Sequence, residues 1–148
     1  MRFWDTSAVV PLLAEEPGSA AARALLREDP ALCIWWAART ECLSGLQRRL
    51  REKKMTRGGF ETARRRLFDL EAAATVVQPS EAVRERAERL LAVHALRAAD
   101  AFHVAAALLA ASDRPGEFAF VTLDERQGEA AEKEGFRVLP ISVGVKAR

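Results

Sequence analysis

The sequence is poor in cysteine and has no long hydrophobic run. Its 148 residues include two cysteines, too few for a disulfide scaffold, and neither Cys33 nor Cys42 belongs to a CxxC or zinc-binding pattern. The longest uninterrupted apolar run, residues 104–111, is far too short to span a membrane. The acidic residue Asp5 falls too early for a secretory signal. These absences predict a cytoplasmic protein with reduced thiols and no membrane partner.

Internal repeats and low-complexity linkers are also missing, and the length suits a single domain. Hydrophobic residues make up 49% of the chain and charged residues 30%, which excludes a wholly disordered protein. We therefore expect one domain over residues 1–143, followed by a short C-terminal tail at residues 144–148.

The net charge is only +2, but the basic residues are unevenly distributed. Residues 47–67 contain nine lysines and arginines against two glutamates. Such a segment suits a polyanion or an acidic partner, and the alternative is a solvated helical hairpin whose arginines simply face water. The candidate contacts for RNA or a partner protein are Arg48, Arg49, Arg51, Arg64 and Arg65.

Hydrophobic patterning predicts strands that alternate with helices. Five apolar runs are expected as strands: residues 2–4, 32–35, 75–77, 118–123 and 136–139. Helices are expected just after Asp5 and over residues 20–27, 38–54, 60–71, 81–93, 98–111 and 125–134. Strands separated by helices favour parallel pairing. The predicted fold class is α/β, with three α/β/α layers and a central, mostly parallel five-stranded sheet.

Local signals set the expected ends of these elements. Thr6 or Ser7 is expected to cap the first helix, and Ser19 the second. Gly58–Gly59 is expected to interrupt the helical pattern between the third and fourth helices. Gly135 is expected to end the last helix, and Pro140 the last strand.

Four acidic residues are predicted to meet at one edge of the sheet. Asp5 and Asp124 come directly after strands, whose carboxyl ends form the ligand-binding edge of a parallel sheet. Asp100 lies in the first turn of a very apolar helix, and Glu41 lies one turn into the helix that follows residues 32–35. Each acid also has a local explanation: a helix cap, a partner of the helix dipole, a turn residue or a surface glutamate.

Carboxylates held close together repel one another, and a hard divalent cation relieves that repulsion. The sequence offers neither a zinc-type cysteine pattern nor paired histidines, so oxygen ligation favours Mg²⁺ or Mn²⁺ over zinc. A cation between carboxylates lowers the pKa of a bound water and neutralises charge on a phosphate, which is the apparatus of phosphodiester hydrolysis. The basic segment would hold the rest of the polyanion.

Four segments carry recognisable motifs: residues 3–8 (FWDTSA), Glu41 near a helix start, residues 96–105 (LRAADAFHVA) and residues 120–126 (FVTLDER). Together they resemble the PIN domain, and within it the VapC-type toxin ribonucleases. No single motif is specific, but the four occur in the family's order and spacing over nearly the whole chain. One departure is the pair Trp35–Trp36, which stands where the family usually has a small or hydroxyl residue.

The resemblance implies a metal-dependent endonuclease of single-stranded RNA that uses one or two Mg²⁺ or Mn²⁺ ions. The family's acidic positions match the four acids named above. The resemblance also implies that Thr6 or Ser7, and Thr122, orient a carboxylate or a water. A small antitoxin protein that covers the site, and homodimerisation, are further implications of the family.

Other chemistry-bearing residues are expected to serve the core. His103, one helical turn after Asp100, is interpreted as a packed, hydrogen-bonded histidine, and His94 as a surface residue at a helix end. Cys33 and Cys42 are interpreted as small buried hydrophobes. The indoles of Trp35–Trp36 could stack on bases, but filling the core is the favoured interpretation.

Two other classes of protein compete with a nuclease. A non-catalytic PIN-like module would bind RNA or protein through the basic segment, but the presence of all four acids argues against it. A haloacid-dehalogenase-like enzyme phosphorylated on Asp5 would need a second Asp two residues on, where Ser7 stands. A receiver domain would need paired acids after the first strand and a lysine after a later strand, and neither Lys133, within a predicted helix, nor Lys146, in the tail, fits that position.

Overall fold

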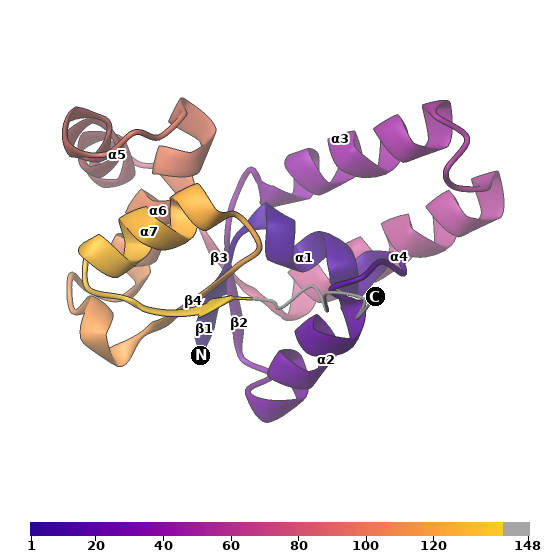
Figure 1. Cartoon of the computed structure of the whole chain (residues 1–148), viewed down its shortest axis with the longest axis horizontal. Coiled ribbons are helices and arrows are strands. Elements are labelled where there is room, and N and C mark those ends of the chain that lie inside the picture. The colour runs from indigo at the N-terminus through magenta and orange to yellow at the C-terminus, as the bar shows by residue number, and fades with distance from the viewer. Residues whose placement is uncertain (141–148) are drawn as a thin grey trace, which may run out of the picture.

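The computed structural model describes residues 1–140, which fold around one five-stranded sheet (Figure 1). All five strands are parallel, in the order β3-β2-β1-β4-β5, so the predicted α/β fold is confirmed. The strands are β1 (Arg2–Trp4), β2 (Leu32–Trp35), β3 (Thr75–Val77), β4 (Ala119–Thr122) and β5 (Arg137–Pro140). The helices are α1 (Thr6–Leu13), α2 (Ser19–Glu28), α3 (Ala38–Arg51), α4 (Arg57–Ala73), α5 (Glu81–Val93), α6 (Ala98–Ala110) and α7 (Glu125–Lys133), with a 3₁₀ turn, η1 (Pro115–Glu117), before β4.

Each face of the sheet is covered by its own layer of helices. Phe3 and Phe120 pack with residues of α5, α6 and α7, whereas Trp4 and Val121 pack with residues of α1 to α4. Neighbouring residues of a strand point to opposite faces, which is why Phe3 and Trp4 belong to different cores. Because both faces are covered, the central strands consist of buried residues without polar alternation.

The strand order brings the polar residues at two strand ends together. β1 lies between β2 and β4, and Trp4 is in register with Val121. The next residue of the first strand, Asp5, donates its backbone N–H to the Val121 carbonyl oxygen at 3.2 Å. Asp5 therefore leaves the sheet beside Thr122, although 117 residues of chain separate the two.

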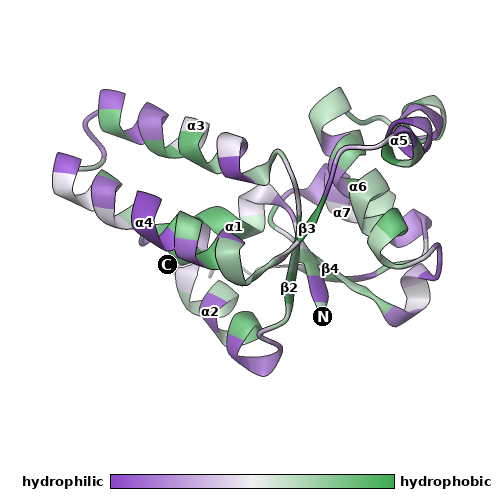
Figure 2. Ribbon diagram, turned by 180° about the vertical axis from the view of Figure 1, so that it is seen from behind, coloured by the Kyte–Doolittle hydropathy of each residue, from purple (hydrophilic) through white to green (hydrophobic). Residues whose placement is uncertain are grey.

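Helices α3 and α4 pack against each other and project from the sheet as a hairpin (Figure 1). Leu46 of α3 and Leu67 of α4 are fully buried in the core that they share with α1 and α2. Hydrophilic residues gather where the two helices are joined (Figure 2). The basic side chains of residues 47–67 therefore lie on the outer side of a packed hairpin, whose apolar residues face the core.

Several element ends differ from the predicted ones. Gly58 and Gly59 do not interrupt a helix but form the first turn of α4, because the Thr56 hydroxyl caps that helix by accepting the Gly59 N–H at 3.0 Å. Helix α3 ends at Arg51, earlier than the predicted residue 54. Strand β5 includes Pro140, which was predicted to end it. A proline is tolerated there because β5 is an edge strand.

Two predicted helix caps are also wrong. Asp5 caps α1 by accepting the Ala8 N–H at 3.1 Å, in place of Thr6 or Ser7. Ser19 lies inside α2, where its hydroxyl accepts the Glu16 N–H at 2.9 Å. At the other end of the chain, Gly135 follows α7 with φ of +98°, a conformation that glycine adopts without strain, and it ends the helix as predicted.

No helix within residues 1–140 has the length and apolarity that a membrane span requires. The apolar helix α6 is 13 residues long, and most of its residues from Ala101 onward are buried in the core on one face of the sheet. The predicted domain boundary at residue 143 and the tail at residues 144–148 fall outside the part of the chain that the structure describes.

Candidate active site

A pocket of about 520 Å³ opens at the carboxyl ends of β1 and β4. Its lining includes all four acids that the sequence predicts to converge: Asp5, Glu41, Asp100 and Asp124. They come from the end of β1, from α3, from the first turn of α6 and from the N-terminus of α7. Parallel α/β sheets bind their ligands at this edge.

Asp5 is the most deeply buried of the four acids and has no exposed surface. Its carboxylate accepts hydrogen bonds from the Ser7 hydroxyl at 2.8 and 3.0 Å and from the Thr122 hydroxyl at 3.0 Å. Desolvation by burial raises the pKa of Asp5 above its ordinary value, although the charge of nearby His103 and the hydrogen bonds act in the opposite direction. Burial thus makes the ionised carboxylate costly in the absence of a positive charge.

Glu41 is held by His103 and Thr6. The Nε2 atom of His103 lies 2.7 Å from Glu41 Oε2, and the Thr6 hydroxyl donates to the same oxygen. Desolvation acts to raise the pKa of Glu41, but the hydrogen bond to His103, the charge of His103 and the Thr6 hydroxyl outweigh it and hold this pKa below its ordinary value. Glu41 is therefore an ionised acid at neutral pH, oriented by two side chains.

His103 is buried, as predicted, but it is also part of the pocket. Its ring is 1% exposed and packs edge-on against Phe3, with 6.4 Å between ring centroids. Its Nδ1 atom is buried and has no hydrogen-bond partner among the described residues. Sequence reasoning missed the link to Glu41; the signal was the spacing from Asp100, which puts both residues on one face of α6.

Gln127 forms hydrogen bonds to both Asp124 and Asp100. Its backbone N–H is accepted by Asp124 Oδ1 at 3.0 Å, and its Nε2 donates to Asp100 Oδ1 at 3.2 Å. Its amide oxygen is buried without a hydrogen-bond partner within residues 1–140. Sequence reasoning missed this residue as well, although an acid followed three positions later by glutamine is the spacing of a helix-capping box.

The three aspartates also interact with the N-termini of helices, and these local roles are compatible with a shared pocket. Asp5 caps α1, Asp124 caps α7, and Asp100 accepts the Arg97 N–H at 3.4 Å in the first turn of α6. All three helices begin at this edge of the sheet. Their N-termini carry partial positive charge, which offsets part of the repulsion among the acids.

The donors that line the pocket fit a hard divalent cation in their chemistry. Four carboxylates and the unpartnered amide oxygen of Gln127 are oxygen ligands of the kind that Mg²⁺ and Mn²⁺ prefer. In their present positions, no three His, Cys, Asp or Glu side chains of the described residues form an ion-binding group. Asp5 is turned toward hydroxyls and Glu41 toward His103, so a cation would compete with these protein donors for the carboxylate oxygens.

Two of the five predicted contact arginines lie at this pocket. Arg48 and Arg49 belong to its lining; Arg48 lies about two full turns of α3 beyond Glu41, and Arg49 lies one residue further. Arg49 is paired with Glu16, whereas Arg48 is exposed and makes no ion pair with any described residue. The other three, Arg51, Arg64 and Arg65, do not line the pocket, and Arg64 pairs with Glu61.

The tryptophan pair is divided between core and surface. Trp35 is 6% exposed and stacks on Phe102, with 5.7 Å between ring centroids and 4° between ring planes. Trp36 is 53% exposed, so the prediction that it fills the core is wrong. Trp36 lies just beyond β2: its backbone N–H still bonds to the Val77 carbonyl oxygen at 3.0 Å, but its side chain belongs to neither of the two cores formed by the described residues.

The cysteines are buried as predicted, and burial raises the pKa of both Cys33 and Cys42 to about 12. Thiols this weakly acidic are not nucleophiles at neutral pH. His94 follows α5, as predicted, but it is not a surface residue: its side chain is 10% exposed, and its Nε2 lies 2.7 Å from Glu134.

Comparison with known families and proteins agrees with this fold and pocket. The family model of the PIN domain matches residues 2–133, and the chain therefore belongs to the PIN domain family. It is similar to two curated proteins of Mycobacterium tuberculosis, Ribonuclease VapC45 and Ribonuclease VapC49. Each is 36% identical over 138 residues, which cover 93% of this chain and 94% of the relative.

Two solved structures share the fold at low sequence identity. A toxin–antitoxin complex from Klebsiella pneumoniae contains a chain with a TM-score of 0.63 and 17% identity, over 86% of this chain and 89% of that one. FitAcB from Neisseria gonorrhoeae gives a TM-score of 0.66 at 16% identity, over 93% and 96% of the two chains. At these identities the similarity establishes a common fold.

Proposed function

We propose that this PIN domain protein is a metal-dependent endoribonuclease that hydrolyses phosphodiester bonds in single-stranded RNA. The observation that carries the proposal is the pocket shared by Asp5, Glu41, Asp100 and Asp124, with the unpaired Arg48 at its wall. Clustered carboxylates bind divalent cations, and a nearby cationic side chain suits the phosphate backbone of a nucleic acid.

The named relatives support the same activity. Both curated relatives are called ribonucleases and match nearly the whole chain. One structure with the same fold comes from a toxin–antitoxin complex. We therefore include in the proposal that the protein is the toxin of a type II toxin–antitoxin pair, with a cognate antitoxin, a homodimeric state and a cytoplasmic location where both cysteines stay reduced.

The four acids would hold one or two Mg²⁺ or Mn²⁺ ions. When bound, such a cation lowers the pKa of a water molecule and neutralises charge on the scissile phosphate. The protein's own residues orient the acids: Ser7 and Thr122 fix Asp5, while Thr6 and His103 fix Glu41.

Substrate binding in this scheme depends on Arg48. Arg48 contributes positive charge on the side of the pocket formed by α3, where the phosphate backbone would pass. Since Arg48 forms no ion pair within residues 1–140, its guanidinium is available for a phosphate oxygen.

Replacing Arg48 with glutamine is expected to raise KM for RNA about 10-fold with little change in kcat, because the lost phosphate contact stabilises bound substrate and transition state alike. The salt dependence of KM should become shallower by about one charge. The matched control is Arg27→Gln, which removes an exposed arginine of α2 that has no ion pair among the described residues. If the KM of Arg48→Gln depends on salt as steeply as that of the unaltered protein, a phosphate contact by Arg48 is excluded.

The proposed activity is tested by incubating the purified protein with structured and unstructured RNAs in Mg²⁺, in Mn²⁺ and in chelator. We expect cleavage of unstructured RNA in the presence of either cation and none in chelator, with readdition of Mn²⁺ restoring it. Cleavage that persists in chelator would contradict the proposed metal dependence. RNA binding without cleavage under every condition would favour a non-catalytic RNA-binding module instead.

A further inference from the structure

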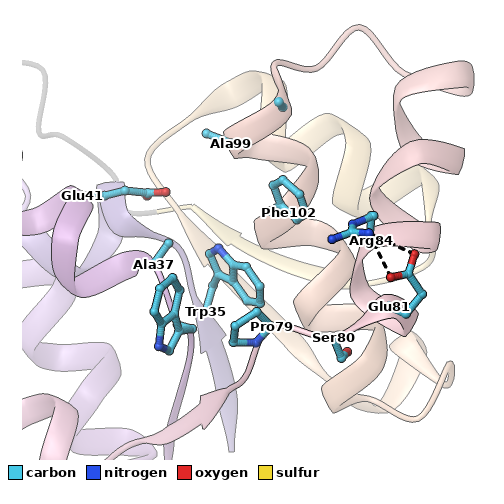
Figure 3. Close-up of a pocket in the computed structure, with 11 residues that line it drawn as sticks. Trp35, Ala37, Glu41, Pro79, Ser80, Glu81, Arg84, Ala99 and Phe102 are labelled. Atoms are coloured by element: carbon cyan, nitrogen blue, oxygen red, sulfur yellow. Dashed lines mark hydrogen bonds and ion pairs between the residues drawn. The ribbon is translucent and has the colours of Figure 1, made fainter.

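A second recess, of about 590 Å³, lies next to the acidic pocket, between the junction of β2 with α3 and the helices α5 and α6 (Figure 3). Glu41 belongs to the lining of both cavities. We propose that this recess is a subsite for one unpaired base of the RNA strand, adjacent to the phosphate held at the acids. The inference rests on the proposed nuclease function and defines how that site recognises its substrate.

The recess has an aromatic wall that the fold holds in place. Trp35 and Phe102 are stacked nearly parallel, and Trp35 is almost fully buried, so the pair forms a fixed surface. Trp36 lines the same recess with about half of its surface exposed, and its backbone is anchored to Val77. Pro79 adds a further apolar surface. Aromatic and apolar walls with one exposed indole are suited to a planar ring, since any base can stack on them.

The charges around the recess favour a neutral ligand over a phosphate. Its charged residues are Glu41, Glu81 and Arg84, and Arg84 is paired with Glu81 at 3.0 Å. Among residues 1–140, no unpaired cation lines this recess, in contrast to the acidic pocket with its Arg48. Figure 3 shows the Arg84–Glu81 pair on one side and Glu41 on the other. The two cavities are therefore complementary to different parts of a nucleotide, its base and its phosphate.

A polar group is also available for the edge of a base. Ser80 lines the recess, and its hydroxyl oxygen accepts the Val83 N–H at 3.3 Å as the cap of α5. The hydroxyl proton remains free to be donated to a ring nitrogen or a carbonyl oxygen of a base. A pocket with mostly apolar walls and a few polar groups is typical of small-molecule recognition.

The shared wall explains why the base must be unpaired. A strand whose phosphate lies at the acids brings an adjacent base past Glu41 to the neighbouring recess. Bases of a duplex face their partners and cannot turn into such a recess, whereas single-stranded bases can stack on aromatic side chains. The arrangement thus couples cleavage to single-stranded substrate.

The inference is tested with fluorescently labelled single-stranded homopolymers of each base, about 12 nucleotides long, bound in chelator so that cutting does not interfere. Trp36→Ala is compared with Trp36→Phe and with Leu91→Ala, which truncates an exposed apolar residue of α5 outside the recess. A ribose–phosphate oligomer of equal length without bases serves as the second probe. We expect Trp36→Ala to weaken binding of the homopolymers about 5- to 100-fold, Trp36→Phe to retain most of the affinity, and Leu91→Ala to have no effect.

The oligomer without bases separates stacking from other effects of the substitution. It should bind the unaltered protein and Trp36→Ala equally, because its phosphates do not enter the recess. Equal homopolymer affinities for these two proteins would overturn the subsite, and so would an equal loss on both probes.

The nuclease proposal is checked separately by cleavage of the same RNAs in Mn²⁺. If the unaltered protein binds and cuts RNA but Trp36→Ala changes nothing, the subsite is wrong and the nuclease stands. If the unaltered protein neither binds nor cuts any RNA, both fail. If Trp36→Ala instead dissociates a dimer, seen by sedimentation velocity, without altering RNA affinity, the recess belongs to a second copy and the base subsite is excluded.

Discussion

Replacing Asp5 with asparagine is expected to reduce RNA cleavage about 1,000-fold or more, since a metal site contributes several kcal/mol of charge stabilisation to phosphodiester hydrolysis. Asparagine keeps the side chain's shape, and its amide oxygen can still accept the Ala8 N–H that caps α1. The negative charge at the centre of the pocket is lost, together with the carboxylate oxygen that accepts the Thr122 hydroxyl. The measurement is the single-turnover rate in Mn²⁺.

The matched control is Glu88→Gln, which neutralises an exposed acid of α5 that has no ion pair among the described residues. That variant should cleave at the rate of the unaltered protein. An Asp5→Asn protein that retains this rate would remove Asp5 from the reaction, and with it the interpretation of the pocket as a metal-dependent active site.

Replacing Glu41 with glutamine is expected to reduce cleavage about 100-fold or more, because it removes a second carboxylate from the same pocket. The glutamine oxygen can still accept the hydroxyl of Thr6, so the side chain stays in place. Cleavage is measured under the same single-turnover conditions. A rate close to that of the unaltered protein would place the metal site elsewhere in the pocket.

Asp5→Asn and Glu41→Gln should change the free energy of unfolding in opposite directions. The pKa of Asp5 is raised in the folded state, so ionisation of Asp5 destabilises the fold as the pH rises from the ordinary value of 3.8 through the raised pKa. Asp5→Asn removes this destabilisation because asparagine carries no charge. The pKa of Glu41 is lowered, so its charge stabilises the fold above the ordinary value of 4.5, and this contribution is lost as pH falls through the lowered pKa.

In chelator at pH 7, thermal unfolding should therefore show a higher Tm for Asp5→Asn and a lower Tm for Glu41→Gln than for the unaltered protein. The difference for Asp5→Asn should shrink as the pH falls through the raised pKa of Asp5 to below 3.8, and the difference for Glu41→Gln should shrink as the pH falls through the lowered pKa of Glu41. The same sign for both variants at pH 7 would contradict the electrostatic account of the pocket.

The fold could be predicted from the sequence because its strands are short apolar runs with clear turn signals between them. Strands β1, β2 and β3 match the predicted residues, and the acids after β1 and β4 lie at the same edge because parallel strands end together. Helix ends were less predictable. The pair Gly58–Gly59 suggests a break, yet the cap provided by Thr56 is enough to start α4 before it.

The contacts between side chains of the pocket could not be predicted in the same way. His103 lies on an apolar face of α6, and only the folded chain shows that this face meets Glu41, 62 residues earlier. The spacing of Gln127 from Asp124 could indicate a helix cap, but only the folded chain shows that the Gln127 amide donates to Asp100. Periodicity identifies the buried face of a helix, but what that face meets depends on how the layers pack.

The most direct test of the central claim is a titration of the purified protein with Mn²⁺ by calorimetry, without RNA. The account predicts saturable binding of one or two ions to the unaltered protein, strong weakening in Asp5→Asn, and unchanged binding in Glu88→Gln. Equal Mn²⁺ affinity in all three proteins, or no binding to the unaltered one, would contradict the claim that these acids form a divalent cation site.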